Sequence, residues 1–529
     1  MYSHSRKRVC VGRGNAVPRP NFVFVMTDSQ GTNMVGAYGR PELRTPHIDQ
    51  LAAEGVRFTS AFTTAPVCTP ARASLFTGIY AHAAGAWANN LPLGDTMHTM
   101  GQRFRDAGYA TAYTGKWHLD GYDYFGTGDC PDGWDSRYWF DGRNYLEKLT
   151  EDERRLWREG LHSVSALREH GITAEWTWAG RNSERAIHFL EERAAVQAGE
   201  AGGVDGADDA PFLLVVSYDE PHGPYTCPPE YAEAFEQYRY PLGPAARDDL
   251  RDKPAHQQEW AASLGGGKGG GEYCESPLYF GCNSFADSEI GRVLAAVDRL
   301  APENTYVFYT SDHGDMMGAH GLAAKGPAMY DEIARIPLIV RQPGKRGAGT
   351  VENTPVSHID LLPTMLDLAG LEVPAALDGG SLTPLLAAPG QNADRSVVIE
   401  FMRFAVNHDS WGGLQPIRCL VNAEYKLVIN LLSDDELYDR RGDPAEMVNL
   451  IADPTHAAAR DRMHDELLNW MGVRSDPWRG PAWERRPWRE GWRQGWVGPG
   501  RARLPDGYAP PVLMPAMRSP KEDPNARGA

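Results

Sequence analysis

Residues 66–78 read Pro-Val-Cys-Thr-Pro-Ala-Arg-Ala-Ser-Leu-Phe-Thr-Gly. Pro70 suits the first turn of a helix, because its φ is fixed and it has no amide hydrogen to leave unbonded. Gly78 is a typical residue to end that helix. Cys68 then lies at the helix N-terminus, where free amides and the helix dipole favour anions, and Arg72 lies one turn later on the same face. The stretch predicts a short helix with an oxyanion site beside a cysteine, although a buried structural cysteine would give the same local pattern.

Four strand-like runs along the chain end in residues that are commonly used in catalysis. The runs and the residues that follow them are 21–27 with Asp28, 109–114 with Lys116 and His118, 212–218 with His222, and 305–310 with Asp312 and His313. Continuous apolar runs of this kind are typical of buried parallel strands, and ligands of open α/β sheets gather at the carboxyl ends of such strands. We therefore expect these side chains to meet at one edge of a sheet.

The residues after the first three of these runs also have a simpler structural interpretation. Asp28 alone could equally cap the next segment. Lys116 and His118 are two apart and point to the same side of an extended segment, which also suits an exposed lysine beside a packed histidine. The proline-rich turn around His222 suits a fixed proton donor or merely connects two elements. The adjacent acid and imidazole of residues 312–313 are good ligands for a divalent metal.

The spacing Cys-x-Pro-x-Arg, followed by Leu-Phe-Thr-Gly, closely resembles the signature of the type I sulfatases. These are formylglycine-dependent members of the alkaline phosphatase superfamily. Further blocks resemble the same family in the same order along the chain: 45–52, Thr-Gly-Lys-Trp-His-Leu at 114–119, Pro-His-x-Pro at 221–224, 311–325 and 436–450. The resemblance spans Asn21 to about Met471.

The resemblance implies a nucleophile and a metal site. In this family the cysteine that matches Cys68 is oxidised after synthesis to formylglycine (3-oxoalanine), whose hydrate is the nucleophile. The metal ligands that the resemblance implies are Asp28, Cys68, Asp312 and His313, around a divalent ion, with Ca²⁺ placed ahead of Mg²⁺ and Mn²⁺. One departure concerns the next ligand. Many members have a second Asp or a Gln directly after the first acid, whereas here Ser29 stands there and Gln30 follows, so either residue could complete the site.

The resemblance also implies which residues act on the substrate. The catalytic set is Cys68, Arg72, Lys116, His118, His222 and Lys325. The substrate-binding set is Asn89, Lys116, His222 and Lys325. Arg72 is expected to orient residue 68, while the lysines and histidines neutralise charge on the sulfonyl oxygens and protonate the leaving group. Asn89 has a simpler interpretation as well, because an asparagine pair in a loop is usually turn chemistry.

The implied function is hydrolysis of a sulfate ester. The dense Tyr and Trp residues of 121–180 are compatible with sulfated sugars, aryl sulfates or N-sulfated amines, with sugars ahead, because aromatic faces stack on sugars and aryl groups. The nearest alternative is a phosphonate monoester or phosphodiester hydrolase of the same superfamily, against which Lys116 and His118 argue. A second alternative is an inactive relative that binds sulfated ligands and keeps an unmodified thiol at Cys68.

The predicted fold is α/β. A large mixed, mostly parallel sheet flanked by helices, like that of alkaline phosphatase, is expected over 21–390, after an N-terminal extension at 1–20. A C-terminal α+β subdomain with a small antiparallel sheet and a helix is expected over 391–472. The tail at 473–529 is rich in Trp, Pro and Arg. Because a solvated tail would expose large apolar area, we expect this tail to pack on the body or on a neighbouring subunit.

Composition restricts the partners and the location. The net charge of −17 over 529 residues argues against nucleic acid and against an anionic membrane surface. No apolar run approaches the ~18 residues of a membrane span, and residues 1–20 lack the hydrophobic part of a secretory signal. Seven scattered cysteines do not resemble a disulfide framework, so a cytoplasmic location is expected unless an upstream start was missed. The expected partners are a small-molecule or carbohydrate sulfate ester and a formylglycine-generating maturation enzyme, and a homo-oligomer is left open.

Overall fold

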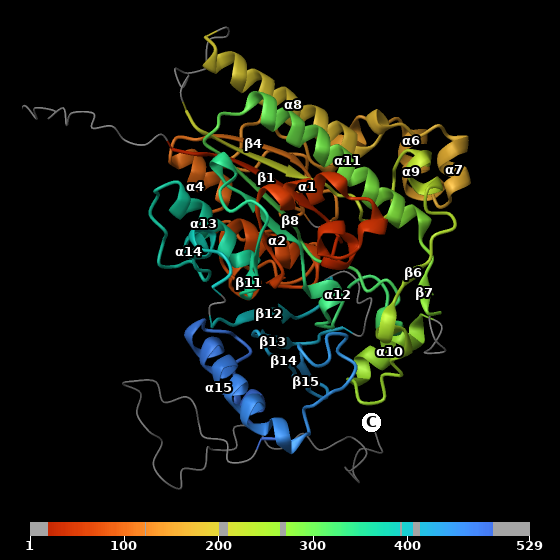
Figure 1. Ribbon diagram of the computed structural model, residues 1–529, viewed down its shortest axis with the longest axis vertical. Coiled ribbons are helices and arrows are strands. Elements are labelled where there is room, and N and C mark those ends of the chain that lie inside the picture. Colours follow the sequence, from red (N-terminus) through yellow and green to blue (C-terminus); the bar gives the residue numbers. More distant parts are fainter. Residues whose placement is uncertain are drawn as a thin grey trace, which may run out of the picture.

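The computed structural model describes residues 19–121, 123–199, 210–264, 271–391, 394–405 and 413–489. Figure 1 shows a large α/β body with a smaller sheet beneath it. The large body is built on a seven-stranded sheet with the order β10-β2-β9-β8-β1-β5-β4. These strands are β10 (Thr350–Glu352), β2 (Val56–Phe58), β9 (Leu338–Arg341), β8 (Thr305–Ser311), β1 (Asn21–Thr27), β5 (Phe212–Ser217) and β4 (Ala110–Gly115).

The four strands β8, β1, β5 and β4 are parallel neighbours, and their register brings their carboxyl ends level. Thr27 pairs with Ser311, Met26 pairs with Ser217, and Ser217 pairs with Gly115. Strand β9 runs antiparallel to β8, and β2 runs antiparallel to β9. The predicted mixed, mostly parallel sheet is confirmed, and the residues that follow the four parallel strands share one edge of it.

Both faces of the sheet are covered by helices, as the all-apolar sequence of β1 requires. Phe22, Phe24 and Met26 pack with one set of helices, whereas Val23 and Val25 pack with the other. The first set is α2 (Cys68–Thr77), α4 (Met100–Asp106), α13 (Leu361–Leu368) and α14 (Thr383–Ala387). The second set is α1 (Pro46–Glu54), α8 (Trp178–Gln197) and α11 (Pro277–Leu300), with α8 and α11 lying side by side in Figure 1.

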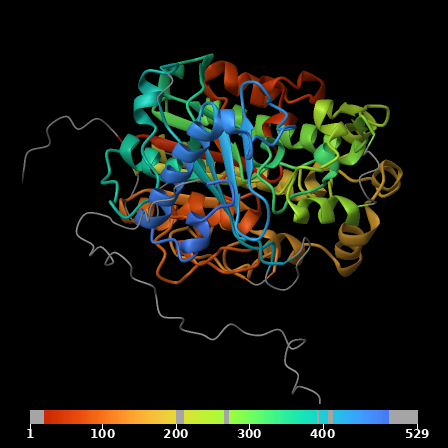
Figure 2. The same ribbon diagram turned by 90° about the horizontal axis from the view of Figure 1, so that it is seen from below.

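A four-stranded antiparallel sheet forms the core of the smaller body. Its strands are β12 (Val397–Phe401), β13 (Ile417–Val421), β14 (Tyr425–Asn430) and β15 (Glu436–Asp439). Helix α15 (Ala457–Val473) lies along this sheet, as Figure 2 shows from below. Val67, the residue before Cys68, packs in the same apolar cluster as β12, β13 and β14, so the small sheet supports the start of α2.

The first part of the tail also packs against the smaller body. Trp483 is 1% exposed in the short helix α16 (Pro481–Glu484), and Trp478 and Trp488 pack on the same cluster. Trp492 and Trp496 lie outside the described residues.

The remaining elements are shorter. They are α3 (Ala81–Ala84), α5 (Gly142–Glu147), α6 (Glu151–Arg155), α7 (Val164–Glu169), α9 (Pro229–Glu233), α10 (Ala255–Ser263), α12 (Asp331–Ala334), the pair β3 (Ala61–Phe62) and β11 (Val356–Ser357), and the pair β6 (Tyr240–Pro241) and β7 (Tyr273–Cys274). In the described part of the chain, no helix combines enough length with enough apolar character to cross a bilayer.

Candidate active site

Helix α2 begins at Cys68 and ends where the sequence predicts. Gly78 has a φ of 70° and donates its amide hydrogen to the carbonyl of Ser74, which closes the last turn. At the other end, the amide of Thr69 donates to Oδ1 of Asn89 over 3.0 Å. The carboxamide oxygen of Asn89 is therefore engaged in holding the first turn of α2, and every residue of this helix is buried.

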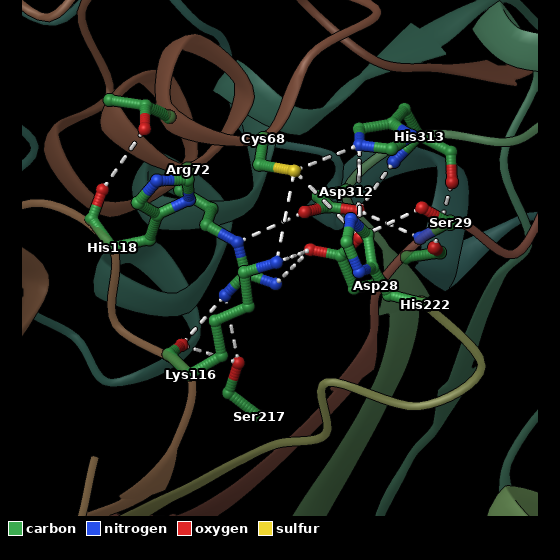
Figure 3. A network of polar contacts seen from close by, with 12 residues as sticks. Asp28, Ser29, Cys68, Arg72, Lys116, His118, Ser217, His222, Asp312 and His313 are labelled. Carbon is green, nitrogen blue, oxygen red and sulfur yellow. Dashed lines mark hydrogen bonds and ion pairs between the residues drawn. The ribbon is translucent and has the colours of Figure 1, made fainter. Parts of the chain in front are cut away.

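Four potential metal ligands surround the start of this helix. One ligand atom from each of Asp28, Cys68, Asp312 and His313 lies within 4.8 Å of the others, and all four residues are buried. The distance from His313 Nε2 to Cys68 Sγ is 3.2 Å. His313 Nδ1 lies 2.8 Å from the carbonyl oxygen of Gly314, so Nδ1 carries the proton and Nε2 presents its lone pair to the cluster. Figure 3 shows these side chains converging from separate elements.

Arg72 donates hydrogen bonds to both carboxylates of this cluster. Its guanidinium is fully buried and donates from Nη2 to Asp28 Oδ2 over 3.1 Å and from Nε to Asp312 Oδ2 over 3.0 Å. Its Nη1 donates to the carbonyl of Lys116 and to Ser217 Oγ. Arg72 therefore bonds to the Oδ2 atom of each carboxylate. The Oδ1 atoms of Asp28 and Asp312 lie 3.8 and 3.6 Å, respectively, from His313 Nε2.

The two residues after Asp28 point in opposite directions. Ser29 has a φ of 61°, and its hydroxyl donates to Asp28 Oδ1 over 2.9 Å. Gln30 turns away, because its Nε2 donates to Asn283 Oδ1 over 2.6 Å and its Oε1 accepts from Tyr309 and from Thr27. Of the two residues left open by the sequence, Ser29 is the one whose side chain lies beside the cluster.

Two lysines flank the sulfur and the carboxylates. Lys325 Nζ lies 2.8 Å from Cys68 Sγ and 3.1 Å from His313 Nε2. Lys116 Nζ lies 3.8 Å from the same sulfur and 2.6 Å from Asp28 Oδ2. Burial and the charge of Asp28 oppose ionisation of the thiol, yet Lys116, Lys325 and His313 lower the pKa of Cys68 to about 6. Burial alone would raise the pKa of Asp28, but the surrounding cations hold it well below its usual value.

Two further histidines each offer one protonated and one unprotonated nitrogen. His118 Nε2 lies 2.8 Å from Asn90 Oδ1, so it carries the proton, and its buried Nδ1 has no partner among the described residues. His222 Nδ1 lies 2.7 Å from the carbonyl oxygen of Gly223, which leaves Nε2 unprotonated in the neutral ring. Burial and the nearby lysines hold the pKa of both imidazoles well below the usual value, which favours the neutral form of both rings.

The structure also places two residues at the site that the sequence did not single out. Tyr124 lies between Lys116 and His222, with its hydroxyl 2.8 Å from Lys116 Nζ. Asp219 accepts from that hydroxyl and lies 3.1 Å from Lys116 Nζ. Tyr124 belongs to the aromatic stretch at 121–180, which gives no periodic signal for any one residue. Asp219 follows β5 in the same turn as His222, and that position was the one available signal.

Glu220 lies beside this site with a strongly shifted titration. Burial, aided by the charge of Asp219, raises its pKa to about 8, and its Oε1 accepts from the amide of Ala179 while its Oε2 is buried without a partner among the described residues. The unfolded chain releases this proton near the ordinary carboxyl pKa of about 4.5, whereas the folded chain keeps it to about pH 8. Stability should therefore fall as the pH rises between these two values.

We expect Glu220→Gln, which cannot ionise, to remove this dependence. Its free energy of unfolding relative to the unsubstituted protein should rise by about 1–3 kcal/mol from about pH 5 to about pH 8. Urea denaturation followed by far-UV circular dichroism at the two pH values measures this difference. Parallel pH dependences for the two proteins would contradict the shifted titration of Glu220.

Two family models match the chain. The model named Sulfatase matches residues 20–371, and the model named N-sulphoglucosamine sulphohydrolase, C-terminal, matches residues 318–472. The chain is also 53% identical over 494 residues to a protein named uncharacterized sulfatase YidJ of Escherichia coli K12, which covers 93% of this chain and 95% of that protein.

Two more distant matches agree. An N-acetylglucosamine-6-O-sulfatase of Bacteroides thetaiotaomicron is 26% identical over 515 residues, covering 83% of this chain and 84% of the relative. A solved structure, described as a complex with its substrate D-glucosamine-2-N,6-O-disulfate, superposes with a TM-score of 0.67 at 21% identity, covering 88% of this chain and all of that chain. This last likeness shows a shared fold.

Proposed function

The chain belongs to the sulfatase family of the alkaline phosphatase superfamily and is a sulfuric ester hydrolase, and from this premise we propose that it cleaves the sulfate ester of a sulfated sugar or an aryl sulfate, through a formylglycine made from Cys68 and a divalent metal ion. An N-sulfated sugar is a further substrate of the same chemistry. The observation that carries the proposal is the buried cluster of Asp28, Cys68, Asp312 and His313 at the start of α2.

The residues present fit both groups. Two carboxylate oxygens and an imidazole nitrogen with its lone pair facing inward suit a divalent cation, and Arg72 and Ser29 orient the carboxylates from outside. The carboxylates suit Ca²⁺, the ion expected from the resemblance, and Mg²⁺, while the imidazole of His313 also suits Mn²⁺. When bound, the metal supplies Lewis-acid activation of the ester and the formylglycine supplies the nucleophile.

The surrounding residues of this chain have separate tasks in the proposed reaction. Lys116 and Lys325 neutralise the charge on the sulfonyl oxygens, because their ammonium groups lie within 3.8 Å of Cys68 Sγ. His118 can take up a proton from the nucleophile at Nδ1, which has no partner among the described residues, and His222, once it carries a second proton at Nε2, delivers that proton to the leaving-group oxygen. Arg72 keeps the two carboxylates, and through them residue 68, in position.

Burial of Cys68 bears on the proposed maturation. Cys68 is 1% exposed and is the first residue of helix α2, in which every residue is buried. A maturation enzyme has to bring its own active site against the sulfur, so it must reach residue 68 before the chain folds around it.

A sugar is placed ahead of other leaving groups for two reasons. Tyr124 and Phe125 are half-buried and pack edge to face, and Tyr124 lies beside His222, where an aromatic face can pack on a sugar ring. The relative from Bacteroides thetaiotaomicron is named for a sulfated amino sugar, and the C-terminal family model is named for another.

The test compares paired esters that share a leaving group. We expect kcat/KM for 4-nitrophenyl sulfate to exceed that for 4-nitrophenyl phenylphosphonate by at least about 10-fold, because two buried lysines and His118 complement a sulfate ester. A phosphonate preference of that size would instead assign the chain to the phosphonate monoester hydrolases. No activity on either ester, with an unmodified thiol at Cys68 by peptide mass spectrometry, would support the inactive sulfate-binding alternative.

A further inference from the structure

We propose that Tyr124 and Asp219 are positioning residues that hold His222 as the proton donor to the leaving group. The inference rests on the proposed function, in which His222 protonates the oxygen released from sulfur. Neither residue follows from the motifs that resemble the sulfatase family, and both come to the site from the structure alone.

The hydroxyl of Tyr124 is a meeting point for three functional groups. It donates to Asp219 Oδ1, accepts from Lys116 Nζ over 2.8 Å and lies 3.1 Å from His222 Nδ1. The rings of Tyr124 and His222 also pack at a centroid distance of 5.1 Å. Tyr124 comes from the segment after β4, whereas His222 and Asp219 follow β5, so the contact joins two strand ends at the site.

The protons of this network can be assigned. His222 Nδ1 faces the carbonyl of Gly223 at 2.7 Å and the hydroxyl of Tyr124, so it is a shared N–H donor to both. The phenol oxygen can accept this hydrogen bond only if its own hydrogen points elsewhere. That hydrogen is donated to the carboxylate of Asp219. A chain of donors therefore runs from His222 Nδ1 through Tyr124 to the buried negative charge of Asp219, which is 3% exposed.

This arrangement offsets a cost that the site imposes on His222. Lys116 and Lys325 favour the neutral imidazole, whereas a proton donor must first carry a proton on Nε2. Asp219, acting through Tyr124, stabilises the imidazolium and fixes the ring with Nε2 toward the ester. As the S–O bond breaks, the Nε2 proton passes to the departing oxygen, and a neutral ring remains with Nδ1–H still bonded to Gly223 and Tyr124.

A competing role for Tyr124 is to seat Lys116. Lys116 Nζ contacts Asp28, Asp219, Tyr124 and the sulfur of Cys68, and it also lies 3.9 Å from the centre of the Tyr124 ring. If Tyr124 acted through Lys116, its loss would weaken binding of the sulfate group whatever the leaving group. If it acts through His222, the loss depends on how much the leaving group needs a proton.

Aryl sulfates with leaving groups of graded acidity separate the two roles. We expect Tyr124→Phe, which keeps the ring packing and the pair between Lys116 and Asp219, to lower kcat/KM for 4-methoxyphenyl sulfate by about 10²-fold, with phenyl sulfate nearly as affected. For 4-nitrophenyl sulfate, whose leaving group departs without protonation, we expect a loss below about 3-fold. Asp219→Asn should also make the loss of kcat/KM grow as the leaving group becomes less acidic, and more steeply than Tyr124→Phe does. Its loss should be larger on every ester, because Lys116 also loses a partner.

A second readout is independent of turnover. In protein labelled with ¹⁵N-histidine, the Nδ1–H resonance of His222, assigned with His222→Gln, should shift in Tyr124→Phe. The matched control is Tyr138→Phe, which removes a phenol bonded to the carboxylate of Glu192 away from the site and should leave both readouts unchanged.

The outcomes are distinct. An equal loss of kcat/KM on all three esters would mean that Tyr124 acts through Lys116. Values of kcat/KM that do not change on any ester, together with an unchanged His222 resonance, would mean that Tyr124 has no part in the mechanism. Either result overturns the inference and leaves the proposed function standing. An unsubstituted, fully matured protein that hydrolyses none of the sulfates would overturn the proposed function, and the inference would fall with it.

Discussion

Replacing Cys68 with alanine is expected to lower kcat/KM for 4-nitrophenyl sulfate by about 10⁴-fold or more, because the proposed nucleophile is made from this side chain. No other group among the described residues stands at the same point. The sulfur lies within 3.2 Å of His313 Nε2, 2.8 Å of Lys325 Nζ and 3.8 Å of Asp28 Oδ1. Lysine and histidine side chains that remain after the substitution can bind the ester, but none is placed by the structure as a substitute nucleophile.

The matched control is Cys419→Ala, another buried cysteine on β13 of the small sheet. Burial raises the pKa of the Cys419 thiol, which packs in an apolar cluster with residues of the small sheet, so we expect its replacement to leave kcat/KM within about 3-fold. Thermal melts of both variants show whether folding is preserved. In the unsubstituted protein, the peptide that contains Cys68 should show the mass loss of conversion from cysteine to aldehyde. Substantial activity in Cys68→Ala would exclude residue 68 as the source of the nucleophile.

Short sequence patterns predicted the two ends of helix α2 and the shared sheet edge at which Asp28 and Asp312 lie. Proline, cysteine and glycine in 66–78 signal a helix start and stop that depend on local backbone geometry alone, and α2 begins and ends accordingly. Asp28 and Asp312 were expected together because each follows an apolar run, and parallel strands bring such residues to one edge. These inferences need no knowledge of which distant side chains touch.

Contacts between distant segments could not be predicted in the same way. Ser29 and Gln30 are adjacent polar residues, and the choice between them depends on Asn283 and Tyr309, which draw Gln30 away from the cluster. Tyr124 stands in a stretch where many aromatic residues have the same local pattern. Its hydroxyl is distinguished only by its contact with Asp219 and His222 in the turn after β5.

Replacing Arg72 with glutamine is expected to destabilise the metal-free protein by about 3–5 kcal/mol. The guanidinium is fully buried and is bonded to two buried carboxylates, those of Asp28 and Asp312. Burial and the charge of Asp28 already raise the pKa of Asp312 to about 7, because the two buried negative charges repel each other. Without Arg72, both carboxylates lose their shared partner, and no other arginine among the described residues contacts either of them.

A divalent cation should restore much of this loss, since in the proposed site it would bind the same two carboxylates from the side of Cys68. Urea denaturation in EDTA and in excess Ca²⁺ or Mn²⁺ measures the effect, and the stabilisation by metal should be larger in Arg72→Gln than in the unsubstituted protein. The control is Arg341→Gln, which also loses two carboxylate partners, Glu54 and Asp298, but at a place where the described residues form no cluster of metal ligands. Its loss should be smaller, because Asp298 is half-exposed, and should not respond to metal. Equal metal responses in the two variants would mean that Arg72 and the cation do not share the carboxylates of Asp28 and Asp312.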